Sequence, residues 1–160
     1  MLDEKSLQIL KILQDKARIP NVEVARQVGL APSAVLERIR KLEKQGFIDG
    51  YEVRLNPWRF RRSLVGFIHI SVAAGADHDA IAKIMADMDE IQEVHYVAGG
   101  DGYLLKVRVA DQQELDALIR KRIGGMAGVT GTHTYIVTSI IKETARIPID
   151  DSDLGPAPGK

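Results

Sequence analysis

Residues 21–45 read NVEVARQVGLAPSAVLERIRKLEKQ, and this stretch predicts two short helices joined by a tight turn. The first helix is expected over residues 22–28 and the second over residues 32–44, each with one apolar face. Gly29 supplies the left-handed residue that ends the first helix, and Pro32 suits the first turn of the second. Such a pair is typical of a helix-turn-helix, whose second helix enters a major groove of DNA.

The outward face of the second expected helix is the candidate DNA-binding surface. Arg38 and Lys41 are expected to contact bases or phosphates directly, and Arg40 is expected at the flank of this face. The hydroxyl of Ser33 can bond a phosphate together with the backbone N–H groups of the helix start. Glu37 either accepts a hydrogen bond from cytosine or pairs with Lys41 one turn later, and the second use is the more ordinary. The candidate DNA-binding residues are Pro32, Ser33, Ala34, Glu37, Arg38, Arg40 and Lys41.

The net charge of the 160 residues is zero, but the charges are unevenly distributed. Residues 1–62 hold 13 Lys and Arg against 8 Asp and Glu, a net charge of +5. Residues 63–145 hold 7 against 11, a net charge of −4, and residues 146–160 hold 2 against 3. This split indicates that only the first part meets a polyanion, although chance asymmetry is an alternative in a chain of this size.

The composition excludes several classes of protein. With 45% hydrophobic and 28% charged residues, it is that of an ordinary globular protein. No apolar run approaches the roughly 18 residues that cross a membrane, and no apolar leader is visible near the N-terminus. The absence of cysteine excludes disulfides, thiolate metal sites and cysteine nucleophiles. A cytoplasmic protein without a membrane partner is therefore expected.

The residues around the helix-turn-helix predict a winged DNA-binding domain over residues 1–55. A first helix, capped by Asp3, is expected over residues 4–15. Asp49-Gly50 lies between two short apolar runs and is a hairpin signal, so a small β-ribbon is expected after the third helix. Residues 56–63 then form a hinge whose three arginines either reach phosphate or only keep the linker soluble.

From Leu64 onward the pattern predicts the element order β-α-β-β-α-β, the ferredoxin-like arrangement. Strands are expected over residues 64–72, 94–98, 103–109 and 132–141, and helices over 77–88 and 111–123. The helices cover one sheet face only, and the other face carries Val65, Phe67 and Leu104, which are too apolar to leave in water. We therefore expect this domain, residues 64–145, to dimerise. Residues 146–160 are expected to form a flexible tail.

Several of these stretches together resemble the Lrp/AsnC family, the feast/famine regulators of bacteria and archaea. The resemblance covers about residues 2–145 and rests on the order and spacing of its pieces. The pieces are Leu2-Asp3, Ile9-Leu10, Ala25 to Leu30, Val35 to Glu43, Gly46-Phe47-Ile48, Gly99 to Val107, Gly128-Val129 and Thr132 to Val137. The resemblance implies an α+β protein with an N-terminal winged helix-turn-helix and a C-terminal ferredoxin-like sensing domain.

The resemblance also implies dimers that assemble into tetramers or octamers, and a small effector bound where two dimers meet. That effector is expected to be an amino acid or related metabolite that changes the oligomeric state or the DNA affinity. In this sequence the acid of the family's turn stands one position earlier, at Asp101. The turn can bind an α-amino group, or it can be a plain hairpin turn. The candidate effector-binding residues are Gly99, Gly100, Asp101, Gly102, Tyr103, Thr132 and Thr134.

No catalytic residue, metal ligand or cofactor is predicted. The four histidines lie far apart in sequence, without an i, i+4 pair and without a cysteine nearby. Two alternatives to a DNA-binding regulator stay open: an enzyme similar to the sirohaem decarboxylases that share this scaffold, and an oligomeric metabolite-binding protein whose DNA-binding domain is vestigial. The basic N-terminal part favours the regulator, with double-stranded DNA and a small-molecule effector as its partners.

Overall fold

The computed structural model describes residues 2–99 and 102–154, which form two compact units. The first unit combines residues 2–54 with residues 143–154, and the second unit comprises the described part of residues 55–142. Each unit has its own buried apolar cluster. The chain therefore has two domains, and residues 143–154 belong to the first of them.

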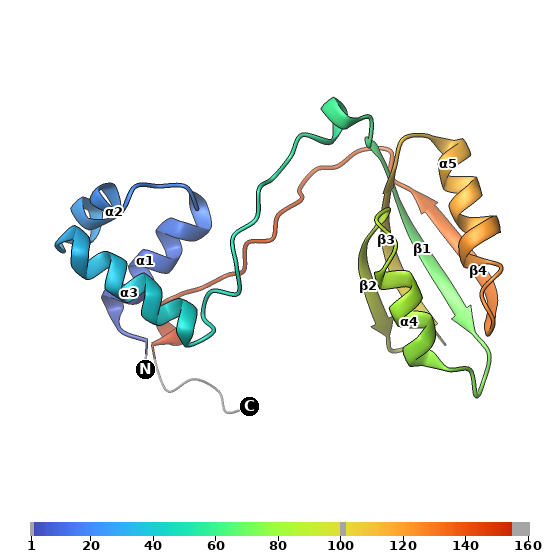
Figure 1. Ribbon diagram of the computed structural model, residues 1–160, viewed down its shortest axis with the longest axis horizontal. Coiled ribbons are helices and arrows are strands. Elements are labelled where there is room, and N and C mark those ends of the chain that lie inside the picture. Colours follow the sequence, from blue (N-terminus) through green and yellow to red (C-terminus); the bar gives the residue numbers. More distant parts are fainter. Residues whose placement is uncertain (1, 100–101, 155–160) are drawn as a thin grey trace. The chain divides into compact units, whose positions relative to one another are not determined.

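Three helices build the first unit: α1 (Glu4–Asp15), α2 (Asn21–Val28) and α3 (Pro32–Lys44) (Figure 1). The carboxylate of Asp3 accepts a hydrogen bond from the N–H of Ser6 at 2.8 Å and caps α1. Gly29 ends α2 in the left-handed conformation, with φ of 68°. The periodic apolar residues form the core, which includes Leu7, Ile9, Leu13, Val24, Ala25, Val28, Val35, Ile39 and Leu42. The predicted helix-turn-helix is confirmed.

The chain after α3 differs from the predicted hairpin. Residues 48–56 carry neither helix nor strand. The commonest two-residue hairpin turn needs positive φ at both central residues, and Gly50 does not have it. Gly46 takes that conformation instead, with φ of 74°, and ends α3. Ile48 then packs against the core of the first unit, so the expected β-ribbon does not form around Asp49-Gly50.

Residues 143–154 pack against α1. The side chain of Gln14 donates to the carbonyl of Ile147 at 2.8 Å and accepts from its N–H at 2.9 Å. Ile149 packs against the apolar core of the first unit. For residues 146–154 this differs from the flexible tail that the composition predicts for residues 146–160, because apolar side chains such as Ile149 pack against the core; residues 155–160 lie outside the described residues.

The second unit is a four-stranded antiparallel sheet with strand order β2-β3-β1-β4 (Figure 1). Its elements are β1 (Leu64–Val72), α4 (His78–Ala86), β2 (Ile91–Val97), β3 (Gly102–Val109), α5 (Gln112–Ala117), a π-helical continuation of α5 (Leu118–Ile123) and β4 (Val129–Ile136). The predicted βαββαβ order is confirmed. β4 starts and ends earlier than predicted, because it pairs only with β1 and residues beyond 137 have no β1 partner.

The two faces of the sheet differ in what covers them. Alternate β1 residues such as Ile68 and Ile70 share a buried cluster with Met85 of α4 and Leu115 of α5. The opposite face carries Val65, Phe67 and Leu104, as predicted. A mixed row of His95, Leu104, His69 and His133 crosses this helix-free face as successive cross-strand partners.

Candidate DNA-binding and effector sites

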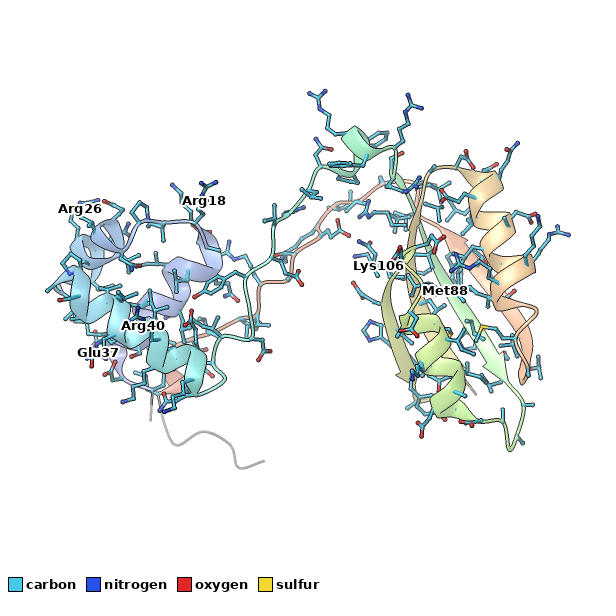
Figure 2. All side chains as sticks on the ribbon, viewed as in Figure 1. Arg18, Arg26, Glu37, Arg40, Met88 and Lys106 are labelled. Atoms are coloured by element: carbon cyan, nitrogen blue, oxygen red, sulfur yellow. The ribbon has the colours of Figure 1, made fainter. Side chains whose placement is uncertain are left out.

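The exposed side of α3 is cationic. The helix buries Val35, Ile39 and Leu42 and leaves the opposite side in solvent. That opposite side consists of Ser33, Leu36, Glu37, Arg40, Lys41 and Lys44. Figure 2 shows Glu37 and Arg40 on this helix. Arg40 therefore belongs to the exposed face rather than to its flank, as the 100° step per residue places it opposite the buried stripe.

Three cations of this face have no partner within the described residues: Arg40, Lys41 and Lys44 make no ion pair there. The pair that the sequence suggested between Glu37 and Lys41 is not formed among the residues that the structure describes. At the other end of the helix, Ala31 is the N-cap and offers no side-chain hydrogen bond. The first-turn N–H groups beside Ser33 are thus left for an outside acceptor such as phosphate.

Arg38 is directed toward α1. Its guanidinium donates to the carboxylate of Asp3 at 2.5 Å and to the hydroxyl of Ser6 at 3.1 Å. The hydrogen bond from Arg38, helped by the N–H of Ser6, lowers the pKa of Asp3 from 3.8 to about 2. Arg38 follows the buried Val35 by three positions, which places it at the edge of the buried stripe. In the free protein, Arg38 links α3 to the start of α1.

The turn between β2 and β3 holds four of the candidate effector residues. Gly99 is left-handed, with φ of 89°, while Gly100 and Asp101 lie outside the described residues. Gly102 starts β3 so close to β1 that a Cβ would collide with the carbonyl of Ile70. Only glycine fits there, because the two backbones approach each other without room for a side chain.

Tyr103 lies in the core rather than in an open pocket. It is 5% exposed, and its hydroxyl donates to the backbone carbonyl of His78 at 3.0 Å. Burial raises the pKa of Tyr103. Its role in the described structure is to hold β3 against the first turn of α4.

The two candidate threonines do not join the turn in one pocket of a single chain. Thr132 pairs with Ile70, and Ile70 pairs with Tyr103, so β1 separates β4 from β3. Neighbouring strands lie about 4.8 Å apart, which puts Thr132 and Tyr103 roughly 10 Å from each other. Thr134 lies two residues further along β4, opposite Ile68.

An aromatic cluster beside the turn was missed by sequence reasoning. The ring of Tyr96 lies 5.5 Å from that of His78 and 5.3 Å from that of Tyr103, measured between centroids. Tyr96 is 66% exposed, so its ring is available to a ligand. The signal was the placement of two tyrosines at matching distances on either side of the glycine-rich turn, which makes them cross-strand partners.

Residues 2–99 and 102–154 contain neither a cluster of metal ligands nor a helix that could span a membrane. No group of three or more His, Cys, Asp and Glu side chains there is placed to hold a metal ion. In the same part of the chain, no helix has the length and apolarity that crossing a bilayer requires.

Two family models match the chain, one for each unit. A winged helix-turn-helix DNA-binding model matches residues 2–49. A model of the Lrp/AsnC ligand-binding domain matches residues 65–147. The two matches follow the division into helix-turn-helix and βαββαβ units.

Characterised relatives match along most of the chain. It is 40% identical over 150 residues to the leucine-responsive regulatory proteins of Klebsiella pneumoniae and Escherichia coli K12, with 92% of each chain covered. The structure resembles that of a transcriptional regulator from Neisseria meningitidis in complex with L-methionine: the TM-score is 0.88, the identity is 28%, and 92% and 97% of the two chains are covered. It also resembles the leucine response regulatory protein LrpA of Mycobacterium tuberculosis, with a TM-score of 0.76, 30% identity and 92% and 100% of the chains covered.

Proposed function

The chain belongs to the Lrp/AsnC family of DNA-binding transcriptional regulators, and we propose that it reads DNA with the exposed face of α3 and responds to an amino acid. The observation that carries the proposal is a set of three cations, Arg40, Lys41 and Lys44, that form no ion pair with any described residue and lie on the second helix of a helix-turn-helix. Second helices of this motif lie in the major groove, where arginine and lysine bind guanine edges and phosphates.

The individual contacts follow from where each side chain stands. Ser33 and the uncapped first-turn N–H groups bind one phosphate, while Arg40 and Lys41 meet base edges or the adjacent phosphates. Pro32 and Ala34 shape the start of the helix at the groove, and Glu37 lies between the cations. Arg38 supports the site by holding α3 to the N-terminus of α1.

The effector proposed is an amino acid bound beside the β2–β3 turn. The regulator from Neisseria meningitidis, similar over 92% of this chain, was solved with L-methionine, which supports an amino-acid ligand here. The exposed Gly99 supplies a backbone amide, and the exposed ring of Tyr96 supplies an apolar surface for the side chain of the amino acid. Because β1 separates this turn from Thr132 and Thr134, those hydroxyls reach the ligand only from another copy of the chain.

Assembly is proposed through the helix-free face of the sheet. Val65 is 3% exposed and Phe67 is half-buried there, while Tyr135 of β4 remains 59% exposed and packs edge-on against His133, with ring centroids 4.7 Å apart. A second copy covers this face in a two-fold dimer, and dimers assemble into tetramers or octamers. The DNA that such a regulator binds lies in the cytoplasm, so we propose that location as well.

No observation favours the enzyme alternative. The relatives and the solved structures that match along the chain are transcriptional regulators. The vestigial-domain alternative is also not favoured, because the exposed cations of α3 are the ones that a functional recognition helix needs.

The test is to titrate L-leucine, L-methionine and then each remaining amino acid while sedimentation and DNA affinity are both recorded. We expect one amino acid to change the oligomeric state or the apparent dissociation constant for DNA. Tyr96→Ala should weaken that response, and Gln113→Ala, which changes another exposed side chain of the second unit, serves as the control. An effector response that is equally strong in Tyr96→Ala would contradict the proposed site.

A further inference from the structure

Residues 57–62, with the sequence PWRFRR, form a defined turn, which we call the arginine turn. Its first four residues make a single turn of 3₁₀-helix. The side chain of Asn56 accepts a hydrogen bond from the N–H of Trp58 at 3.1 Å, and the N–H of Arg62 donates to the carbonyl of Pro57 at 2.9 Å. Both ends of the turn are therefore fixed, unlike those of a flexible linker.

Arg62 connects the arginine turn to the sheet and helices of the second unit, to which the turn itself belongs. The guanidinium of Arg62 lies 3.4 Å from the carboxylate of Glu114, and the carbonyl of Arg62 accepts from Arg108 at 3.4 Å. Arg59 and Arg61 make no ion pair within residues 2–99 and 102–154. Arg59 and Arg61 are thus held on an ordered turn but form no ion pair with the described residues.

The residues beside these cations are also unusually exposed. Trp58 is 76% exposed and Phe60 is 59% exposed. Arg61 has φ of 52°, a left-handed conformation that bulky residues rarely adopt and that glycine adopts without strain. A strained arginine that directly follows the exposed Phe60 is a reason to look for a binding role.

The sequence around the turn carries arginines and no acidic residue, which favours an anionic partner. No Asp or Glu occurs between Glu52 and Asp77, so the turn lies in a wholly non-acidic stretch. Three acids of the second unit already form ion pairs, Glu93 with Lys106, Glu90 with Arg122 and Asp116 with Arg120, and a contact of the turn with a second copy is the alternative that sedimentation tests. Duplex DNA presents one phosphate charge about every 1.7 Å along its axis, and these charges carry no covalently attached cation.

We propose that the arginine turn is a second DNA-binding surface, in which Arg59 and Arg61 bind phosphates that flank the site read by α3. The rings of Trp58 and Phe60 pack against the sugar edges beside those phosphates. The chain allows this reach: Arg59 follows Lys44 by 15 positions, which spans at most roughly 50 Å and exceeds the ~34 Å of one DNA turn. The proposal rests on the proposed DNA-binding function.

The experiment compares the full chain with Arg59→Ala, Arg61→Ala on two duplexes, one extending at least one turn beyond the footprint of α3 and one trimmed to that footprint. Losing two phosphate contacts per bound chain should lower the slope of log affinity against log salt by about 1.8 for each chain that contacts the long duplex, which weakens binding about 60-fold per chain at 0.1 M salt. On the trimmed duplex the variant should equal the wild type. Arg120→Ala, Lys121→Ala removes the same charge from the second unit and should leave the slope unchanged.

Trp58→Ala, Phe60→Ala separates DNA contact from assembly, with sedimentation as the readout. This variant should keep the wild-type oligomeric state. A smaller oligomer would identify the turn as a contact between copies, and an unchanged slope in Arg59→Ala, Arg61→Ala would overturn the proposal directly. Normal behaviour of that double variant beside loss of binding in Arg40→Ala, Lys44→Ala would overturn the second surface while leaving the proposed function intact.

Discussion

Arg40→Ala should weaken specific DNA binding, while Arg38→Ala should mainly reduce stability. Arg40 is exposed on α3 and without an ion pair in the described structure, so its removal costs the folded protein little. If Arg40 reads a base edge, its loss costs about 1–3 kcal/mol of binding free energy, or about 5- to 150-fold in affinity. Discrimination at one base pair should relax with it.

The effect of Arg38→Ala follows from its ion pair with Asp3. The fall in the pKa of Asp3 from 3.8 to about 2 sets an upper limit of about 2 kcal/mol on the whole environment of that carboxylate. The two side chains are 34% and 54% exposed, so solvent screening reduces the expected loss of unfolding free energy to about 0.5–1 kcal/mol.

This stabilisation has a defined pH dependence. Because the folded-state pKa of Asp3 is lowered, the contribution is present above pH 3.8 and is lost as the pH falls toward about 2. Urea unfolding of Arg38→Ala and wild type should show a clearly larger difference at pH 7 than at pH 2, where Asp3 is about half protonated in the folded state. The DNA affinities of Arg38→Ala and Arg40→Ala are then measured by fluorescence anisotropy with the operator. Wild-type stability of Arg38→Ala together with a loss of DNA affinity as large as that of Arg40→Ala would refute this reasoning.

Three other substitutions test the fold that carries the sites. Gln14→Ala removes both hydrogen bonds to Ile147 and should lower the free energy of unfolding by about 1 kcal/mol, measured by urea denaturation, with exposed Gln27→Ala as the comparison. A stability equal to wild type would show that residues 143–154 are not held to α1. Gly102→Ala drives a methyl group into the carbonyl of Ile70 and should cost at least about 3 kcal/mol or prevent folding, whereas Gly131→Ala, which meets nothing within 4 Å, should fold normally. Phe67→Asp places a charge on the helix-free sheet face and should weaken the dimer at least about 30-fold in sedimentation equilibrium; an undisturbed dimer would exclude this face as the interface.

The helices of the first unit could be predicted because local signals agree with the packing. Apolar residues recur with helical spacing, Asp3 caps α1, and Gly29 and Pro32 mark the turn, so no distant residue is needed to place α1, α2 or α3. β1 was predicted with its observed bounds for a similar reason, since a run that is apolar on both faces specifies a central strand.

Several contacts of the candidate site residues, and the missing hairpin, depend on packing between distant parts of the chain. Helical spacing places Arg38 beside the buried stripe, but its partner Asp3 is 35 positions away and becomes visible only when α1 packs on α3. Asp49-Gly50 does not form the predicted hairpin, because Gly46 ends α3 and Ile48 packs against the core of the first unit. Tyr96 likewise meets His78 only once the β2–β3 hairpin lies against α4.

The most direct test of DNA reading by α3 is binding of the purified chain to the DNA upstream of its own gene, compared with random DNA of equal length, over a range of salt concentrations. We expect saturable binding that weakens steeply with salt and, at physiological salt, a preference for DNA containing the operator, with that preference reduced in Arg40→Ala. The operator, if not upstream, can be selected from a random pool. No DNA binding even at low salt, by a folded and assembled chain, would contradict the central proposal.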